Sequence, residues 1–536
     1  MALPLLLTFL LLNEAQASPT RVSPQEIALI TPAPTATLAV YAHAGAKRGI
    51  VGDITSKLDS YVNSVFSELG SAIPSYVTEG ILPNEVDLPT GSQVLSSAGL
   101  SSSDMDAVPT QVLNIPGYGN WTNNGWNLRV HGNVFKQPNI SQDTIDDLAN
   151  FFLIDTSVAD LPASQQAQAR NLTREIYVVQ QGDVNVTVDI LPGPSNGASG
   201  QPGGSGGVTP AGGENLITLP YPTTDEGDFD VFVPIDNTTL NVQAGTGDVP
   251  PQRLNVYAQG TDTGNATSYL VSDQGLTVIS DIDDILRITK IYDPKEGLLN
   301  SFARPFTPWM NMPDIYRNWS VSLPSMHFHY LTTTPEQITR NYMEFIYNTY
   351  PGGSFDTRPL NFSDLSATLS IRKFLLDKIF LTFPNRKFIL VADTSNSDVM
   401  RDYPAMATDF PNQVQCIFLR NTSSTDPTDR FPYDTKGFKN LNQQSYMFFN
   451  VPDDLTGLDI SNGQCYNASV KQNLTFGYQG LPFGIDDQGD GQSGNSSGSG
   501  SGSGNAAPRL LGAGSGWMNT IGLSALVFGV LMFNGL

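Results

Sequence analysis

The stretch VISDIDDILR, residues 278–287, ends an apolar run with three aspartates within four positions. Residues 276–279 are typical of a buried strand, and carboxylates that lose water near one another repel and are costly to keep charged. Asp281 and Asp283 lie two residues apart, so they point to the same side as long as the chain stays extended. Two carboxylates held in this way share either a proton or a cation, which makes this strand end a candidate functional site.

The chain around this stretch alternates strands and helices from residue 276 to about residue 470. Apolar runs and helical spacing predict strand 326–331, helix 334–346, helix 371–379 and strand 387–392. Thr334 and Pro335 supply an N-cap and a first-turn proline for the first of these helices. Such alternation predicts an α/β fold in which a parallel sheet is covered by helices on both faces.

Polar clusters follow the predicted strands at 281–284, 332–334 and 393–398. In an open parallel sheet, ligands bind beyond the carboxyl ends of the strands. Mg²⁺ takes oxygen ligands from one or two carboxylates together with a substrate phosphate. Asp281, Asp283 and Asp393 therefore predict a magnesium site. A calcium-stabilised loop or a solvated turn is the alternative on spacing alone.

Residues 111–275 have a different pattern, made of short alternating runs separated by Gly, Pro and Asn turns. This pattern predicts an antiparallel β domain that precedes the α/β domain, 276–485. The glycine-rich stretch 193–215 predicts a flexible loop within the β domain. The region before it, 18–110, is partly helical or irregular, and its clearest helix is predicted around 53–69.

Both ends of the chain predict processing in the secretory pathway. Residues 1–17 combine an apolar run with a small-residue ending, as a signal peptide does. The segment 506–536 ends in an apolar tail and follows a Gly/Ser-rich tether, 486–505, which is the order found in a GPI-attachment signal. We therefore expect a lipid anchor at Asn505 and a location on the cell surface. A transmembrane anchor is the alternative, although residues 521–536 are short for a span.

Glycosylation sequons agree with secretion. They begin at Asn120, Asn139, Asn171, Asn185, Asn237, Asn265, Asn318, Asn361, Asn421, Asn467, Asn473 and Asn495. The chain has 2 cysteines, Cys416 and Cys465, and an even pair in an oxidising compartment predicts one disulfide.

The chain is acidic, with a net charge of -23. It has no basic cluster, so nucleic acid is excluded as an expected partner, because phosphate backbones are bound by concentrated Lys and Arg. The same acidity opposes any anionic substrate. A bound metal ion would reverse this unfavourable field locally.

Four motifs resemble, in order and spacing, those of one known family. They are VISDIDDILR at 278–287, RPFTPWMNMP at 304–313, FHYLTTTP at 328–335 and FPNRKFILVADTSNSD at 383–398. The family is that of the phosphatidate phosphatases typified by the fungal actin patch protein, a branch of the haloacid dehalogenase superfamily. The resemblance covers roughly residues 276–420. It implies a haloacid-dehalogenase-like catalytic domain in a secreted fungal member.

The resemblance also implies roles for the matched residues. Asp281 would be the nucleophile that accepts the phosphoryl group as an aspartyl-phosphate. Asp283 would act as general acid and then as general base. Thr332 would donate a hydrogen bond to the phosphoryl oxygens. The chain departs from the family motifs at Ile285 and Ala392.

The remaining roles concern the cation and the phosphate. By the resemblance, Asp281, Asp393 and Asp398 would hold Mg²⁺, with Asp283 contributing its backbone carbonyl. A helix should also direct one basic side chain at the phosphate. Catalysis would then rest mainly on positioning and charge neutralisation, as in other phosphoryl transfers. The alignment leaves Arg372 and Lys373 both open for this role, since neighbouring positions lie on different faces of a helix.

The resemblance implies a Mg²⁺-dependent phosphatidate phosphatase, or another lipid phosphomonoesterase, acting on a phospholipid at a membrane surface. Two alternatives stay open: a noncatalytic glycosylated surface protein that keeps the fold, and a phosphatase for soluble phosphomonoesters or phosphoproteins. No large insertion separates Asp281 from Thr332, so we expect an active site without a bulky cap of its own. His327 and His329, two apart on a strand, are expected to be hydrogen-bonded rather than metal-bound.

Overall fold

The computed structural model describes residues 91–150, 152–193, 215–261, 263–358, 365–426 and 435–472. The predicted signal peptide, the helix around 53–69, most of the glycine-rich loop, the tether and the anchor segment with Asn505 lie outside these ranges, as do Asn361, Asn473 and Asn495. Within the described ranges, no helix has the length and apolar character needed to cross a membrane.

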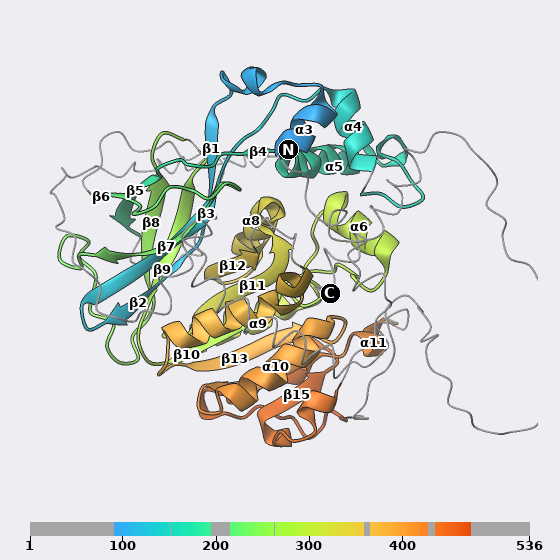
Figure 1. The fold of residues 1–536 in the computed structure, drawn as a ribbon. Helices are drawn as coiled ribbons and strands as arrows, with labels where there is room; N and C mark the ends of the chain where they lie inside the picture. Colours follow the sequence, from blue (N-terminus) through green and yellow to red (C-terminus); the bar gives the residue numbers. More distant parts are fainter. Residues whose placement is uncertain are drawn as a thin grey trace, which may run out of the picture.

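The segment 110–271 forms a mostly antiparallel sheet (Figure 1). Its strands are β1 (Thr110–Ile115), β2 (Tyr118–Thr122), β3 (Gly125–Lys136), β4 (Val179–Gln180), β5 (Thr187–Pro192), β6 (Leu216–Thr218), β7 (Asp228–Ile235), β8 (Gln252–Ala258) and β9 (Asn265–Val271). The order is β1-β3-β2-β9-β8-β5-β6, and β4 and β7 also pair with β3. The antiparallel prediction therefore holds for every pair described except β2 and β9, which run parallel. Parallel neighbours need a long connection, and here most of the other strands form that connection.

Two helices that the sequence analysis missed, α4 (Gln142–Asn150) and α5 (Ala163–Ile176), lie between β3 and β4. Their apolar side chains share a buried cluster with α3 (Gly91–Ala98) and α6 (Pro294–Phe302). Helix α5 also contacts the 3-10 helix η5 (Glu336–Ile338). Because Ala169, Leu172 and Ile176 recur at helical spacing and are buried, their periodicity could have revealed α5.

The second sheet is parallel, in the order β12-β11-β10-β13-β14-β15 (Figure 1). Its strands are β10 (Leu276–Ser280), β11 (His327–Pro335), β12 (Ser354–Arg358), β13 (Lys387–Asp393), β14 (Val414–Arg420) and β15 (Tyr446–Phe449). Its main helices are α7 (Met312–Ser322), α8 (Thr339–Thr349), α9 (Leu365–Thr382) and α10 (Ser397–Asp409), and the four-residue α11 (Thr422–Thr425) follows β14.

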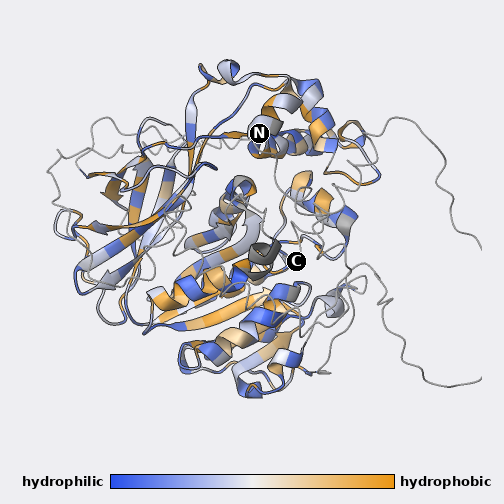
Figure 2. Ribbon diagram, viewed as in Figure 1, coloured by the Kyte–Doolittle hydropathy of each residue, from blue (hydrophilic) through white to orange (hydrophobic). Residues whose placement is uncertain are grey.

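Alternate residues of the parallel strands pack into two cores, and Figure 2 shows how apolar the central strands are. Val278 and Val391 pack with side chains of α7 and α8 on one face. Ile279 and Leu390 pack with side chains of α9 and α10 on the other. The predicted parallel sheet with helices on both faces is therefore confirmed.

One helix boundary differs from the prediction. Strand β11 continues to Pro335, and the chain passes through η5 before α8 begins at Thr339, so the predicted N-cap at Thr334 is wrong. Pairing between Pro335 and Arg358 keeps this part of β11 extended.

The two sheets meet along a surface that we call the seam, formed by β2, β3, β7 and β9 on one side and β11, β12 and the end of α9 on the other. Arg129 on β3 bonds Asp230 at 2.8 Å and Asp356 on β12 at 2.7 Å. Phe355 N donates to Pro116 O at 2.8 Å, and Tyr118 lies in the same core cluster as residues of α9. The two parts therefore share both a buried ion pair and a continuous apolar core.

Candidate active site

The predicted site lies where the order of the parallel sheet changes direction. From β10 the chain first builds β11 and β12 on one side, and then β13, β14 and β15 on the other. Ser280 pairs with Val391, and Asp281 N donates to Val391 O at 2.8 Å. Asp281 and Asp393 thus stand at the carboxyl ends of neighbouring strands, the place where open α/β sheets bind their ligands.

Arg372 of α9 connects two of the predicted carboxylates. Its Nη2 lies 3.2 Å from Asp281 Oδ2, and its Nε donates to Asp398 Oδ2 at 2.8 Å. All three side chains are buried. Burial raises the pKa of Asp281 to about 7, although Arg372 opposes this shift. One buried guanidinium thus faces two buried carboxylates and favours their charged forms, which burial opposes.

Asp393 completes the strand-end cluster. Its Oδ1 accepts hydrogen bonds from Ser395 N at 2.7 Å and from the Ser395 hydroxyl. Its Oδ2 is buried without a hydrogen-bond partner, as is Asp398 Oδ1. Burial, Asp284 and Asp281 together raise the pKa of Asp393 well above its ordinary value. Such buried oxygens without partners need a proton or a cation nearby.

The strand-end carboxylates are candidate ligands for Mg²⁺. Within the described residues, no group of three or more Asp, Glu, His or Cys side chains is arranged to hold a metal ion. The four predicted carboxylates, Asp281, Asp283, Asp393 and Asp398, therefore do not form a ready-made cage. Mg²⁺ usually takes only one or two protein carboxylates and keeps several waters. The adjacent ends of β10 and β13, with the unpartnered Asp393 Oδ2, fit that smaller requirement.

Asp283 is held differently from Asp281. Its Oδ1 accepts hydrogen bonds from Arg287 Nε at 2.9 Å and from Thr289 Oγ1 at 2.7 Å. Arg287 is itself buried, and its guanidinium lies over the Phe306 and Tyr342 rings at 4.2 and 4.5 Å. Sequence reasoning missed Arg287, although its position four residues after Asp283 was a usable signal. One oxygen of Asp283 is thus fixed, which orients the other.

Asp284 contributes its charge to the strand-end cluster, where it helps raise the pKa of Asp393, while its carboxylate bonds the adjoining loop. Its carboxylate accepts hydrogen bonds from the backbone N–H groups of Thr289, Lys290 and Ile291 at 2.8–3.0 Å. The residue has a φ of 53°, a conformation that Asp tolerates better than most residues. Arg420, which sequence reasoning also missed, donates to the Asp284 carbonyl oxygen. These bonds fix the turn that carries Asp283.

Thr332 lies near the end of β11 and is buried. Its Oγ1 accepts a hydrogen bond from Thr334 N at 3.1 Å, so the hydroxyl hydrogen remains available to another acceptor.

Lys373 lies away from the strand-end cluster and pairs with Asp377 at 2.9 Å and Asp409 at 3.0 Å. Of the two candidate cations, Arg372 is therefore the one beside Asp281.

Comparison with known proteins matches the part of the chain that contains these candidate site residues. Residues 276–421 match the family model of the catalytic domain of phosphatidate phosphatase APP1. Phosphatidate phosphatase APP1 of Saccharomyces cerevisiae is 26% identical over 200 residues, which cover 35% of this chain and 34% of the relative. Residues 276–421 belong to this catalytic-domain family. The chain spans about a third of the length of that curated relative, and the β sheet that precedes residue 276 lies outside the family model.

Two further predictions concern the cysteines and the histidines of β11. The structure joins Cys416 on β14 to Cys465, which follows the matched residues. His327 Nε2 lies 3.0 Å from Ser354 Oγ, and His329 Nε2 lies 3.1 Å from Asp356 Oδ2. Both histidines thus contact β12 at the seam.

The different positions of Arg372 and Lys373 allow a matched test. Arg372→Ala should leave Asp281 and Asp398 buried without their cation, which costs about 3–5 kcal/mol of unfolding free energy. Lys373→Ala removes partly exposed pairs and should cost only about 0–1 kcal/mol. Chemical denaturation of the two variants measures this difference. Equal losses would show that Arg372 is not structurally distinct from its neighbour.

A buried carboxyl pair lies where β7 meets η5, directly after β11. Glu336 hydrogen-bonds Asp228 of β7, whose Oδ1 also accepts from Asn133 Nδ2 at 2.6 Å. Burial and the neighbouring Asp228 raise the pKa of Glu336 well above its model-compound value of 4.5, and Asp230 adds to this shift. The pKa of Asp228 is also raised, by burial first and then by Glu226 and Asp230.

This pair makes the stability of the fold depend on pH. Because the folded state holds the shared proton more tightly than the unfolded state, stability should fall as pH rises above about 4.5. Glu336→Gln keeps a hydrogen-bond donor for Asp228 and should flatten this fall. Melting temperatures at pH 5 and pH 8 measure it, with the exposed Glu344→Gln as the control. Parallel pH profiles for wild type and Glu336→Gln would contradict the prediction.

Proposed function

We propose that this protein is a Mg²⁺-dependent phosphatidate phosphatase with a haloacid-dehalogenase-like catalytic unit. The observation that carries the proposal is the buried Asp281 at the carboxyl end of β10, with Arg372 Nη2 3.2 Å from its Oδ2. The family match to residues 276–421 supports the same activity. The proposal extends to lipid phosphomonoesters in general, because one set of reacting groups would serve all of them.

Asp281 would attack the phosphorus through Oδ2, since its Oδ1 already accepts a hydrogen bond from Ile282 N at 2.9 Å. The attack forms an aspartyl-phosphate and releases the alcohol, which divides hydrolysis into two easier displacements. The Arg372 guanidinium beside Asp281 can donate to phosphoryl oxygens and stabilise their charge. Thr332 offers a further hydroxyl donor from β11.

Asp283 would protonate the departing alkoxide and then deprotonate the water that hydrolyses the aspartyl-phosphate. Arg287 and Thr289 hold its Oδ1, which leaves Oδ2 to carry the proton. Bound Mg²⁺, held by Asp281 and Asp393, with Asp398 close by and the Asp283 carbonyl as a further ligand, would neutralise charge on the phosphoryl group. Asp398 would mainly position Arg372, whose Nε donates to Asp398 Oδ2 at 2.8 Å.

Phosphate release measures the activity directly. The glycosylated full chain is offered phosphatidate in mixed micelles and a soluble aryl phosphate, each with Mg²⁺ and with a chelator. Release from phosphatidate only when Mg²⁺ is present supports the proposal. Release from the aryl phosphate alone would indicate a phosphatase for soluble substrates, and release from neither would indicate a noncatalytic protein.

We also propose that the protein follows the secretory route and reaches the cell surface on a GPI anchor. The small residues around Asn505, the tether before them and the apolar tail support this proposal. An anchor would keep the enzyme beside a membrane, where a phospholipid substrate is found. Phosphatidylinositol-specific phospholipase C should then release the protein from cells. Retention of the protein with residues 521–536 still attached would contradict the anchor.

A further inference from the structure

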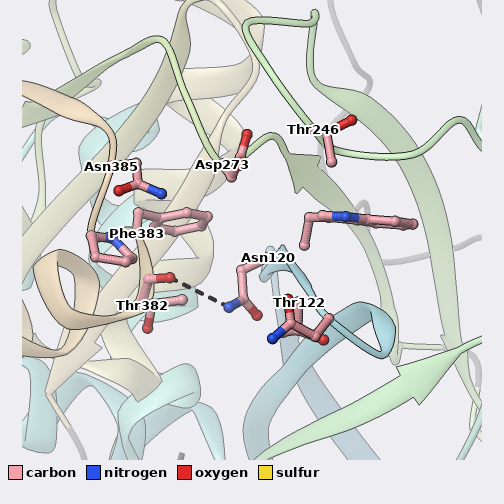
Figure 3. Close-up of a pocket in the computed structure, with 10 residues that line it drawn as sticks. Asn120, Thr122, Thr246, Asp273, Thr382, Phe383 and Asn385 are labelled. Carbon is pink, nitrogen blue, oxygen red and sulfur yellow. Dashed lines mark hydrogen bonds between the residues drawn. The ribbon is translucent and has the colours of Figure 1, made fainter.

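A hollow of about 240 Å³ opens at the seam, at the edge of the parallel sheet opposite the strand-end carboxylates. One wall comes from β2 and the segment after it (Asn120 to Asn123), together with Thr246 and Asp273, and the other from residues 382–385. Figure 3 shows these side chains around a common space. Residues 382–385 precede the first residue of β13, so the hollow lies at the amino edge of the sheet and the candidate active site at the carboxyl edge.

Asn120 stands in this hollow and begins the sequon Asn120-Trp121-Thr122. Its Nδ2 donates to Thr382 O at 3.3 Å, across the seam (Figure 3). Its Oδ1 is buried without a hydrogen-bond partner. Glycosylation replaces one of the two Nδ2 hydrogens, so the other could still donate to Thr382 O.

The lining of the hollow has the chemistry of a sugar site. Trp121 provides aromatic surface, against which the C–H face of a pyranose ring can pack, and the largely buried Phe383 also lines the hollow. Thr246, Asp273 and Asn385 provide polar groups that can bond hydroxyl and acetamido groups. Ligand sites commonly combine an aromatic lining with a few polar groups in this way.

We propose that Asn120 carries an N-linked glycan whose first sugar, an N-acetylhexosamine, is seated in this hollow and bridges the seam. In the transfer, Asn120 Nδ2 displaces the diphosphate of a lipid-linked oligosaccharide donor. An Nδ2–C1 bond forms, the C1–O bond to the diphosphate breaks and Nδ2 loses one proton. The inference rests on the proposed secretory route and is independent of phosphatase activity.

The order of synthesis permits this arrangement. Asn120 precedes Thr382 by 262 positions, so the sugar is attached while the second wall of the hollow does not yet exist. The chain then folds around the sugar. The exposed sequon at Asn139 differs, because its glycan would project into solvent. Sequons of both kinds therefore occur in the same protein and can be compared directly.

The first experiment uses the full chain from a eukaryotic secretion host. Glycopeptide mass spectrometry should find Asn120 occupied, and native peptide N-glycosidase should release its glycan much more slowly than that of Asn139, at least about tenfold. Occupied Asn139 with unmodified Asn120, or equal release rates, would overturn this inference alone. Absence of glycan at every sequon would overturn it together with the secretory route.

A second experiment measures the bridge. Thr122→Ala destroys the sequon, whereas Thr122→Ser keeps both the sequon and a hydroxyl that can replace the present bond to Gly125 O at 2.9 Å. In secreted protein, Thr122→Ala should melt about 2–4 °C below Thr122→Ser. The same pair made in bacteria, without glycan, gives the contribution of the hydroxyl. If the two variants differ in melting temperature by the same amount in both hosts, no sugar stabilises the seam.

Discussion

Asp281→Asn is expected to reduce turnover to background on phosphatidate and on aryl phosphates alike, a loss of roughly 10⁴-fold or more. The amide removes the attacking oxygen and the charge that Arg372 and a cation recognise. It can still accept the hydrogen bond from Ile282 N, so the strand end should keep its geometry. Phosphate release under saturating substrate measures the loss, and a thermal melt checks that the variant is folded.

Asp377→Asn is the matched control for this loss of one carboxylate. Asp377 lies on α9, where it pairs with Lys373 at 2.9 Å and not with the strand-end cluster. Its substitution should leave turnover within about twofold of wild type, because surface pairs contribute little. Substantial turnover by Asp281→Asn would exclude Asp281 as the nucleophile.

Asp283→Asn is expected to give a loss that depends on the leaving group. A lipid alkoxide needs a proton to depart, so turnover on phosphatidate should fall roughly 10²–10⁴-fold. An aryl phosphate, whose leaving group departs as a stable anion, should lose far less. Oδ1 of the Asn can replace the acceptor that Arg287 and Thr289 now bond. The ratio of the two losses is the quantity to measure.

Mg²⁺ titration separates this mechanism from a simple metal-binding cluster. Asp283→Asn should keep wild-type dependence on Mg²⁺, since its proposed contribution to the cation is a backbone carbonyl. Asp281→Asn should weaken Mg²⁺ binding, which isothermal calorimetry can follow without turnover. Equal losses for both variants on both substrates, with Mg²⁺ binding lost in each, would favour the cluster over a nucleophile and acid pair.

The parallel sheet and its polar edge could be predicted because both are local signals. Apolar runs such as KFILVA give the strands, and a carboxylate directly after a run gives its end. The choice between Arg372 and Lys373 could not be made in this way. Neighbouring helix positions differ by about 100° around the axis, and only the packing of α9 against the sheet places Arg372 beside Asp281.

Other features depend on contacts between distant residues. The parallel pairing of β2 with β9 joins Tyr118 to Tyr269, and no local pattern encodes such a partner. The same holds for Arg129, which reaches Asp356 across 227 positions of sequence. Helix α5 was missed for another reason. Its many polar residues hide a short apolar stripe that a local search could have found.

The seam sets a limit on how this chain can be divided. A fragment that begins at Leu276 would hold every catalytic residue proposed above, yet it would lose Tyr118, Tyr269 and Val271 from the core that they share with α9. It would also expose the backbone of Phe355, which now donates to Pro116 O at 2.8 Å. Uncovered apolar surface beside an open strand edge favours aggregation. We therefore expect the matched segment 276–421 to be poorly soluble when produced alone, because the preceding sheet covers part of its core and the backbone of its β12 edge.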